Sequence, residues 1–277
     1  MGAFPGPREP DSPYDTIAGE GEGAYRPMED ARAALLERHE RTSKPRTAGL
    51  TIILDTGLGV RAIRDLAEVA GDHVDYAKIA WGSALITGNL QAKVALYREL
   101  GIVPLLGGTL FEYAHLYGKV EELLGFVRDT RLHVEISDGV VNVPRSEKLR
   151  WIEAFARVTE VFSEVGGKVE SQNPDWSRQI PEELSAGAAR VVIEGREVGP
   201  VGQEIREEVV DAVLAAAPVD KLVFEALERK QQVWLIKKLG LNVNLANVRP
   251  AELLTLESFR LGLKEHTLLH TRQREEP

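Results

Sequence analysis

Eight short apolar runs, each followed by an amphipathic segment, constrain the fold of this chain more than any other feature of its sequence. The runs lack the strict apolar–polar alternation of a half-exposed sheet, so they suit strands of a parallel sheet that helices cover. Eight such units within about 220 residues favour an α/β fold of the closed (β/α)8 or TIM-barrel type over an open doubly wound sheet. The predicted strands are Leu50–Leu54, Val74–Ala80, Ile102–Leu106, Leu132–Ile136, Val161–Val165, Arg190–Ile193, Leu222–Phe224 and Val243–Leu245.

Helices are expected between these runs. A chain of 277 residues can form one barrel, because barrels of about 250 residues are ordinarily single domains. No GxGxxG or GxxxxGKS/T loop follows the first run, which weakens the alternatives of a Rossmann fold and a P-loop fold. The expected helices lie near residues 60–70, 89–100, 112–128, 146–157, 179–187, 204–216, 229–239 and 251–263.

The beginning of the chain has a different composition from the rest. Residues 1–24 are acidic and rich in proline and glycine, and such a segment cannot bury enough apolar surface to order itself. We therefore predict a flexible N-terminal arm, followed by a short polar helix over residues 28–41. The expected organisation is an N-terminal extension over residues 1–44, a catalytic barrel over residues 45–268 and a C-terminal tail over residues 269–277.

Composition and charge exclude several classes of function. The chain has no cysteine, so disulfides, zinc–thiolate sites and thiol nucleophiles are excluded. A formal net charge of −9 argues against a nucleic-acid partner. No apolar run reaches the ~18 residues of a membrane span, and the N-terminus lacks the apolar core of a signal peptide. We therefore expect a cytoplasmic protein that binds neither membranes nor nucleic acid.

Charged residues follow the predicted strands at the ends that a barrel brings together in its mouth, where the chemistry of such enzymes lies. Clustered carboxylates repel one another and need a cation or protons, and oxygen ligands without histidine or cysteine favour Mg²⁺ or Mn²⁺ over zinc. Cationic side chains and glycine-rich turns suit an anionic, phosphorylated substrate. The carboxylates are Asp55, Glu135, Asp138, Glu164 and Glu194, and the cations are Lys78, Lys168 and Arg196.

A plainer interpretation applies to each of these residues taken singly. Charged side chains at strand ends also cap helices and form structural ion pairs. For one residue both interpretations stay open, whereas for the whole set the repetition at successive strand ends favours a functional site.

The strand-end motifs resemble those of the phosphosulfolactate synthase family over about residues 44–268. The motifs GGTLFEYA (107–114), VEISDG (134–139) and VIEGREVG (192–199) occur in order at the expected strand ends, which makes the resemblance specific. The other matching stretches are GLTIILDTGLG (49–59), DYAKIAWGSALI (75–86), SEVGGK (163–168), VFEALERKQQ (223–232), VNLANV (243–248) and LESFRLGLKEHT (256–267).

The resemblance implies a Mg²⁺-dependent, homo-oligomeric lyase of the (β/α)8 fold that adds sulfite to C3 of phosphoenolpyruvate, giving 2-phospho-3-sulfolactate. On this basis Lys168, Glu194 and Arg196 are expected to be catalytic, with Lys168 as the general acid that protonates C2. The metal is expected on Glu135, Asp138 and Glu164. The expected substrate-binding residues are Asp55, Thr56, Lys78, Gly107, Gly108, Thr109, Gly195 and Asn247.

The chain also departs from the family's usual motifs. Thr56 stands where the family usually has lysine in the motif LDKG, KIAWGS replaces KFGWGT, and Val198 replaces serine in EGRESG. Loss of a cation beside the first strand matters for sulfite, because this small dianion needs positive charge near it. Two alternatives therefore stay open: an enzyme that joins phosphoenolpyruvate to a different second substrate, and a non-catalytic homologue of the stress-associated kind.

Overall fold

The computed structural model describes residues 28–36, 41–168, 174–200 and 202–273 of the chain. The chain divides into two compact units, residues 1–40 and residues 41–277. In the first unit the described element is α1 (Met28–Leu35), which lies within the range of the predicted polar helix. The predicted arm over residues 1–24 lies outside the described residues, and the domain boundaries proposed from the sequence stay predictions.

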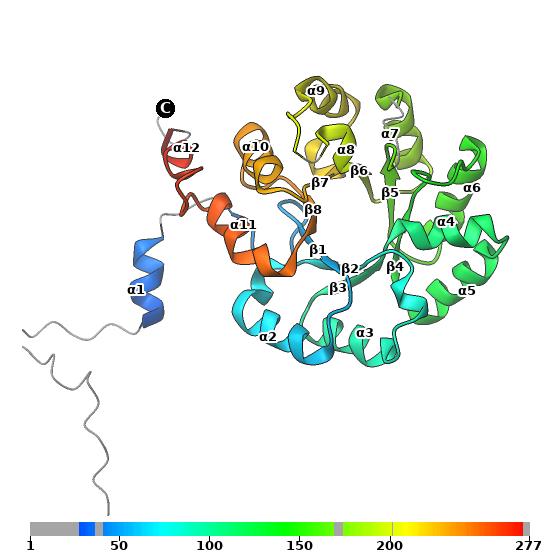
Figure 1. The fold of residues 1–277 in the computed structure, drawn as a ribbon, viewed down its shortest axis with the longest axis horizontal. Helices are drawn as coiled ribbons and strands as arrows, with labels where there is room; N and C mark the ends of the chain where they lie inside the picture. Colours follow the sequence, from blue (N-terminus) through cyan, green and yellow to red (C-terminus); the bar gives the residue numbers. More distant parts are fainter. Residues whose placement is uncertain (1–27, 37–40, 169–173, 201, 274–277) are drawn as a thin grey trace, which may run out of the picture. The chain divides into compact units, whose positions relative to one another are not determined.

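Eight parallel strands form a closed barrel in the second unit, in the order of the sequence and with β8 paired to β1 (Figure 1). The predicted (β/α)8 fold is confirmed, and each strand begins within two or so residues of an apolar run. The strands are β1 (Thr51–Asp55), β2 (Tyr76–Ile79), β3 (Val103–Leu106), β4 (His133–Ile136), β5 (Val161–Val165), β6 (Arg190–Ile193), β7 (Leu222–Glu225) and β8 (Leu245–Val248).

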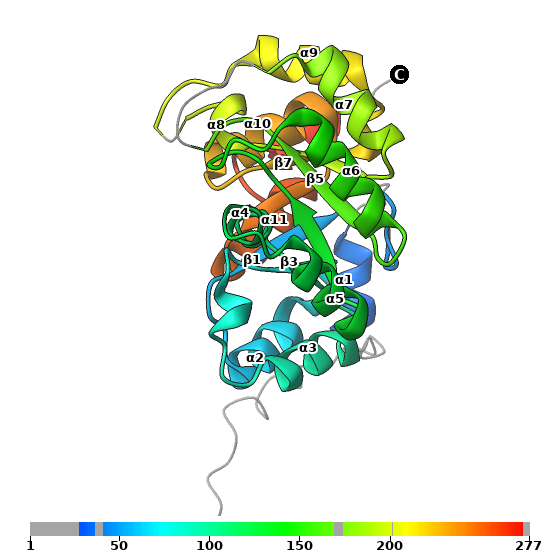
Figure 2. The ribbon, with the colours of Figure 1, turned by 90° about the vertical axis from the view of Figure 1, so that its right-hand side faces the viewer.

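Helices surround the strands and cover the outside of the barrel (Figures 1 and 2). Among the described residues, no helix is both long and apolar enough to cross a membrane. The helices of this unit are α2 (Val60–Ala70), α3 (Leu90–Glu99), α4 (Gly108–Leu116), α5 (Val120–Thr130), α6 (Arg145–Ala156), α7 (Trp176–Ser185), α8 (Gly195–Val198), α9 (Glu207–Ala216), α10 (Arg229–Leu239), α11 (Leu253–Arg260) and α12 (Leu268–Gln273).

The prediction of one helix over residues 112–128 is wrong, because this segment holds two helices. Helix α4 begins earlier, directly after β3, and ends in a turn at Gly118, whose φ of +63° favours glycine. The backbone N–H of Lys119 closes that turn by donating to the carbonyl of Ala114 at 2.7 Å, and α5 begins at the next residue. The early start of α4 brings its N-terminus to the mouth of the barrel, where the charged residues lie.

Apolar side chains fill the interior of the barrel below the mouth, while two larger clusters pack the helices against its outside. The interior layer consists of Leu50, Ile52, Tyr76, Leu105, Phe162, Val192, Val223 and Ala246. Barrels of this kind have packed interiors rather than pores, so the cavity that remains lies above this layer.

Candidate active site

On β2, β5 and β7, a charged side chain of the mouth follows a residue of the interior layer by two positions and so lies on the same face of the strand. Side chains alternate between the two faces of a strand, so residues two apart share a face. Phe162 belongs to the interior layer and Glu164 follows it on β5; in the same way Tyr76 is followed by Lys78 on β2. Glu225 occupies the equivalent position on β7. The sequence thus places a ring of charged groups on an apolar floor.

A cavity of about 360 Å³ opens at this ring. Its lining comes from the C-terminal ends of most of the strands, as expected for the active site of a barrel enzyme. The sequence-predicted residues that line it are Lys78, Gly107, Gly108, Thr109, Glu135, Glu164, Lys168, Glu194, Arg196 and Asn247, and they are joined by Leu54, Trp81, Glu225 and Leu227.

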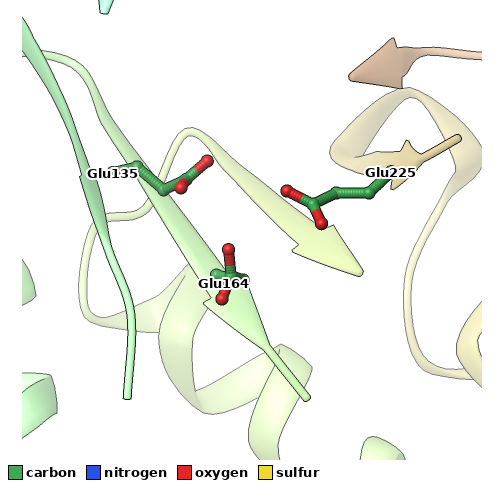
Figure 3. Close-up of side chains that lie close together, drawn as sticks. All are labelled: Glu135, Glu164 and Glu225. Atoms are coloured by element: carbon green, nitrogen blue, oxygen red, sulfur yellow. The ribbon is translucent and has the colours of Figure 1, made fainter. Parts of the chain in front are cut away.

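Three buried glutamates form the centre of the cavity, and their carboxylates point toward one another (Figure 3). Lys78 Nζ lies between two of them, 2.9 Å from Glu135 Oε2 and 2.9 Å from Glu225 Oε1. Burial alone would lower the pKa of Lys78, but Glu135, Glu225 and Glu164 outweigh burial and raise that pKa above its usual value. The positive charge of Lys78 therefore offsets part of the charge of the carboxylate cluster.

Glu164 is the least compensated of the three glutamates. Its side chain is 1% exposed, and its Oε2 has no hydrogen-bond partner among the described residues. Burial is the main reason that the pKa of Glu164 is raised well above its usual value; Lys168 opposes the shift, and Glu135 and Glu225 add to it. A buried carboxylate of this kind takes up a proton or binds a cation.

Lys168 reaches into the cavity from the turn that follows β5. Its Nζ lies 2.7 Å from Glu164 Oε1 and donates hydrogen bonds to Ser137 Oγ at 3.0 Å and Glu112 Oε1 at 3.2 Å. Burial would lower the pKa of Lys168, but Glu164, Glu135 and Glu112 raise it above its usual value. The ammonium group is thus held by three oxygens at the wall of the cavity, with 22% of the side chain exposed.

Glycine is required where α4 meets this wall. A Cβ on Gly108 would lie 2.6 Å from Ser137 Oγ and 3.0 Å from Glu135 Oε1, too close for any side chain. The Gly108 N–H instead donates to Glu135 Oε1 at 2.9 Å. The glycine in the GGTL motif therefore allows the N-terminus of α4 to hold a carboxylate of the cluster.

Two residues in the wall have a backbone conformation that side chains other than glycine rarely adopt. Trp81 has a φ of +53° and Asn247 a φ of +58°, and both line the cavity. Asn247 is 8% exposed, and its Oδ1 has no hydrogen-bond partner among the described residues. Strained backbone and unsatisfied polar atoms concentrate at functional sites, so both observations favour this cavity as the candidate functional site.

Glu194 lies at the edge of the cavity and caps α8, accepting a hydrogen bond from the Arg196 N–H at 3.3 Å. Its side chain is largely buried and faces Glu225. Burial first, and the negative charge of Glu225 second, raise the pKa of Glu194 to about 7, although the Arg196 N–H, Lys168 and Lys78 oppose the shift.

This shift predicts how stability depends on pH in metal-free protein. Between pH 4.5 and about 7 folded Glu194 holds a proton that the unfolded chain has lost, so the wild type loses stability as pH rises through this window. Relative to Glu194→Gln, the loss is on the order of 3 kcal/mol. Urea unfolding of both proteins at a series of pH values measures it, with Glu121→Gln, at an exposed position, as the control. Parallel pH profiles for wild type and Glu194→Gln would contradict the assignment.

Four of the residues predicted from the sequence do not line the cavity. Asp55 is fully buried on the outer side of β1, where its carboxylate pairs with Lys93 Nζ at 2.6 Å and accepts from Tyr97 Oη at 2.7 Å. Thr56 follows it and is exposed. Gly195 donates its N–H to Glu225 Oε2 at 3.4 Å from behind the wall, and Asp138 pairs with a lysine of α6.

Glu225 is the site residue that the sequence prediction missed. Glu225 is the last residue of β7, and Glu164 is the last but one of β5. Each follows a buried apolar residue by two positions, Val223 on β7 and Phe162 on β5. Side chains alternate between the two faces of a strand. Applied to the end of each predicted strand in turn, this rule identifies Glu225 as a residue that points into the barrel.

The three glutamates fit a hard divalent cation. One oxygen of each of Glu135, Glu164 and Glu225 lies within 4.8 Å of the others, and all three residues are buried. Carboxylate oxygens are the ligands that such cations prefer. Glu164 Oε2, which has no hydrogen-bond partner in the described part of the chain, is a donor that a cation would satisfy. The predicted ligands Glu135 and Glu164 belong to this group, with Glu225 in the place that the sequence prediction gave to Asp138.

The closed barrel and the charged cavity at the C-terminal ends of its strands define a (β/α)8-barrel enzyme with a carboxylate cluster suited to a metal ion. The chain belongs to the phosphosulfolactate synthase family, because the family model described as (2R)-phospho-3-sulfolactate synthase (ComA) matches residues 39–266. The family membership inferred from the strand-end motifs is thereby confirmed.

Relatives of known name support the same assignment. The chain is 39% identical over 243 residues to a phosphosulfolactate synthase of Methanothermobacter thermautotrophicus, covering 82% of this chain and 94% of the relative. It is 34% identical over 244 residues to that of Bacillus subtilis, covering 84% and 97%. A more distant relative is Protein HEAT-STRESS-ASSOCIATED 32 of Arabidopsis thaliana, 26% identical over 265 residues, covering 81% and 90%.

Solved structures share the fold. The 3-hexulose-6-phosphate synthase of Salmonella typhimurium has a TM-score of 0.52 at 13% identity, covering 82% of this chain and 100% of that one. The BexX/CysO complex of Amycolatopsis orientalis contains a chain with a TM-score of 0.55 at 14% identity, covering 87% and 96%. At such low identity these similarities bear on the barrel fold alone.

Proposed function

We propose that this protein adds sulfite to C3 of phosphoenolpyruvate and so forms 2-phospho-3-sulfolactate, with Mg²⁺ as its metal ion. The observation that carries the proposal is the convergence of Lys78, Lys168 and Arg196 with a buried carboxylate triad in one cavity of a member of this family. The cavity is of a size that suits a small ligand, and its charged groups suit a substrate with a phosphate and a carboxylate.

The reaction forms a bond between C3 and the sulfite sulfur and a bond between C2 and hydrogen. Of the bonds in phosphoenolpyruvate, it breaks only the π bond between C2 and C3. The sulfite sulfur attacks C3, the electrons of the C2=C3 bond move to C2 and into the carboxylate, and a proton adds to C2. The phosphate ester stays intact. When bound, a divalent cation on Glu135, Glu164 and Glu225 supplies electrostatic stabilisation of the charge on the substrate carboxylate.

We assign proton transfer, substrate binding and the positioning of the carboxylates to side chains of the cavity. Lys168 is the cation that reaches the cavity wall with a transferable proton, so it is assigned as the general acid at C2. Arg196 lines the cavity from an exposed position and is assigned to the phosphate, since its planar guanidinium suits that group. Lys78 holds Glu135 and Glu225 in place, and Asn247 offers a buried amide to the substrate.

The direct test is an assay of purified protein with phosphoenolpyruvate, sulfite and Mg²⁺, with the product identified by mass spectrometry. We expect a product with the mass of the two substrates combined, and none when either is left out. Binding of phosphoenolpyruvate without turnover would favour a different second substrate. No binding of any phosphorylated ligand would favour a non-catalytic role.

Thr56 allows a sharper test of the second substrate. It is exposed, follows the end of β1 and replaces the family's usual lysine. We predict that Thr56→Lys raises kcat/KM for sulfite by roughly threefold, because one added cation near the mouth attracts a dianion through solvent. Thr56→Met, of similar length without the charge, is the control. Efficient wild-type turnover that the lysine leaves unchanged would mean that the protein needs no cation at this position.

The homo-oligomer implied by the family also stays a prediction. Light scattering coupled to size-exclusion chromatography of the full chain measures the mass in solution, and a monomer at micromolar concentration would contradict it.

A further inference from the structure

Lys148 is a buried lysine that lies outside the cavity, on helix α6. Its side chain is 1% exposed, and its Nζ lies 2.7 Å from Asp138 Oδ1, 2.6 Å from the backbone carbonyl oxygen of Glu164 and 3.0 Å from Glu183 Oε1. These partners belong to three segments: the turn after β4, strand β5 and helix α7. A cation that joins three segments at such short distances fixes them relative to one another.

The turn after β4 supports the side chain of Lys168. The carbonyl of Gly139, the residue after Asp138, accepts the Lys168 N–H at 3.0 Å. A Cβ on Gly139 would lie 2.9 Å from Lys168 Cγ and 3.1 Å from the Gly166 carbonyl oxygen. The aliphatic part of Lys168 therefore lies directly against this turn, and a shift of the turn moves the lysine.

Strand β5 is held by the same cation. Lys148 binds the backbone of Glu164 from outside, while the carboxylate of Glu164 lies inside the cavity, 2.7 Å from Lys168 Nζ. The ammonium group of Lys148 thus holds Glu164 directly, through its backbone carbonyl, and Lys168 indirectly, through the turn at Asp138 and Gly139.

We infer that Lys148 is a positioning residue, which fixes Lys168 and Glu164 in the geometry that proton transfer to C2 requires. The inference rests on the proposed function, in which Lys168 is the proton donor. It also gives Asp138 a role, as the link between Lys148 and the turn that supports Lys168.

The variants Lys148→Met and Asp138→Asn test the inference, and their folding is favoured by the remaining contacts. Glu183 keeps its ion pair with Arg145, and the Asp138 side chain is 26% exposed, so neither variant leaves a fully buried carboxylate without a cation. The control is Arg46→Met, because Arg46 pairs with buried Asp75 at 3.0 Å at the opposite end of the barrel.

We expect Lys148→Met and Asp138→Asn to lower kcat by about 100-fold, the effect of a misplaced reacting group, with KM for phosphoenolpyruvate within about threefold of wild type. The solvent deuterium isotope effect on kcat rises, because proton transfer becomes the slow step. The double variant Lys148→Met/Asp138→Asn should be no slower than Lys148→Met alone, because both substitutions break the same ion pair between Lys148 and Asp138. Arg46→Met, which also removes a cation paired with a buried carboxylate, is expected to keep the wild-type kcat and isotope effect.

A second measurement does not depend on turnover. Amide exchange of Lys168 accelerates in Lys148→Met and stays unchanged in Arg46→Met, because the hydrogen bond to Gly139 is lost only in the first. Unchanged kcat and unchanged exchange in folded Lys148→Met would overturn the positioning role. Accelerated exchange in a protein that does not use sulfite would support the positioning role and refute the proposed function.

Discussion

Lys168→Met is expected to lower kcat by about 10³-fold, within the range of general acid catalysis, while the binding of phosphoenolpyruvate should weaken far less. Methionine keeps the length of the side chain but carries no transferable proton, so the carbanion at C2 would lose the donor that the proposed mechanism assigns to it. Glu164, which loses its cation, can take up a proton, because burial raises its pKa well above the usual value. We therefore expect the variant to fold, with the chemical step as its main defect.

Steady-state kinetics with sulfite and phosphoenolpyruvate, together with calorimetric binding of phosphoenolpyruvate, separate the two effects. Lys119→Met is the control, since Lys119 is an exposed lysine on the outside of the barrel. A Lys168→Met protein with kcat within threefold of wild type would remove Lys168 from the chemistry. A variant that binds phosphoenolpyruvate far more weakly but retains kcat at saturation would instead make Lys168 a binding residue.

The period of the apolar runs was sufficient to predict the barrel, and the position of charged residues after each run was sufficient to predict where the site lies. The position of a charged residue after an apolar run does not by itself tell whether its side chain points into the barrel or toward the helices outside it. Asp55 ends β1 and Glu164 is the penultimate residue of β5, yet Asp55 follows the inward-facing Leu54 by one residue and so points outward to Lys93. Glu164 follows inward-facing Phe162 by two residues and points into the cavity.

Asp138 shows a different limit. It lies beyond the end of β4, where the alternation of the strand no longer fixes direction, and its partner Lys148 is ten residues further along the chain. No local pattern relates the two residues, since the contact depends on how α6 packs against β4 and β5. The left-handed backbone of Trp81 is likewise not signalled by its residue type, whereas asparagine, as at Asn247, adopts this conformation more readily than most residues.

Removal of divalent metal ions is expected to abolish turnover, and Mg²⁺ or Mn²⁺ to restore it. In the proposed mechanism, the negative charge that develops on the substrate carboxylate lies beside three buried glutamates, and Lys78 and Lys168 offset their charge only in part. Metal binding should also release any proton that Glu164 carries, because burial raises the pKa of this carboxyl well above its usual value and a metal ligand must be deprotonated. Calorimetric titration in buffers with different ionisation enthalpies measures that proton directly.

Two matched variants decide which carboxylates bind the metal. Glu225→Gln should weaken Mn²⁺ binding at least about tenfold, a loss that even the partners of a metal ligand can cause, whereas Asp138→Asn should leave Mn²⁺ affinity unchanged despite its lower kcat. The reason is geometric: Glu225 lies with Glu135 and Glu164 in the cavity, while Asp138 is held by Lys148 behind its wall. Electron paramagnetic resonance of bound Mn²⁺ makes the measurement without turnover. The opposite result, loss of Mn²⁺ in Asp138→Asn with Glu225→Gln unaffected, would return Asp138 to the metal site. Full activity in metal-free protein would leave the glutamates a purely electrostatic role.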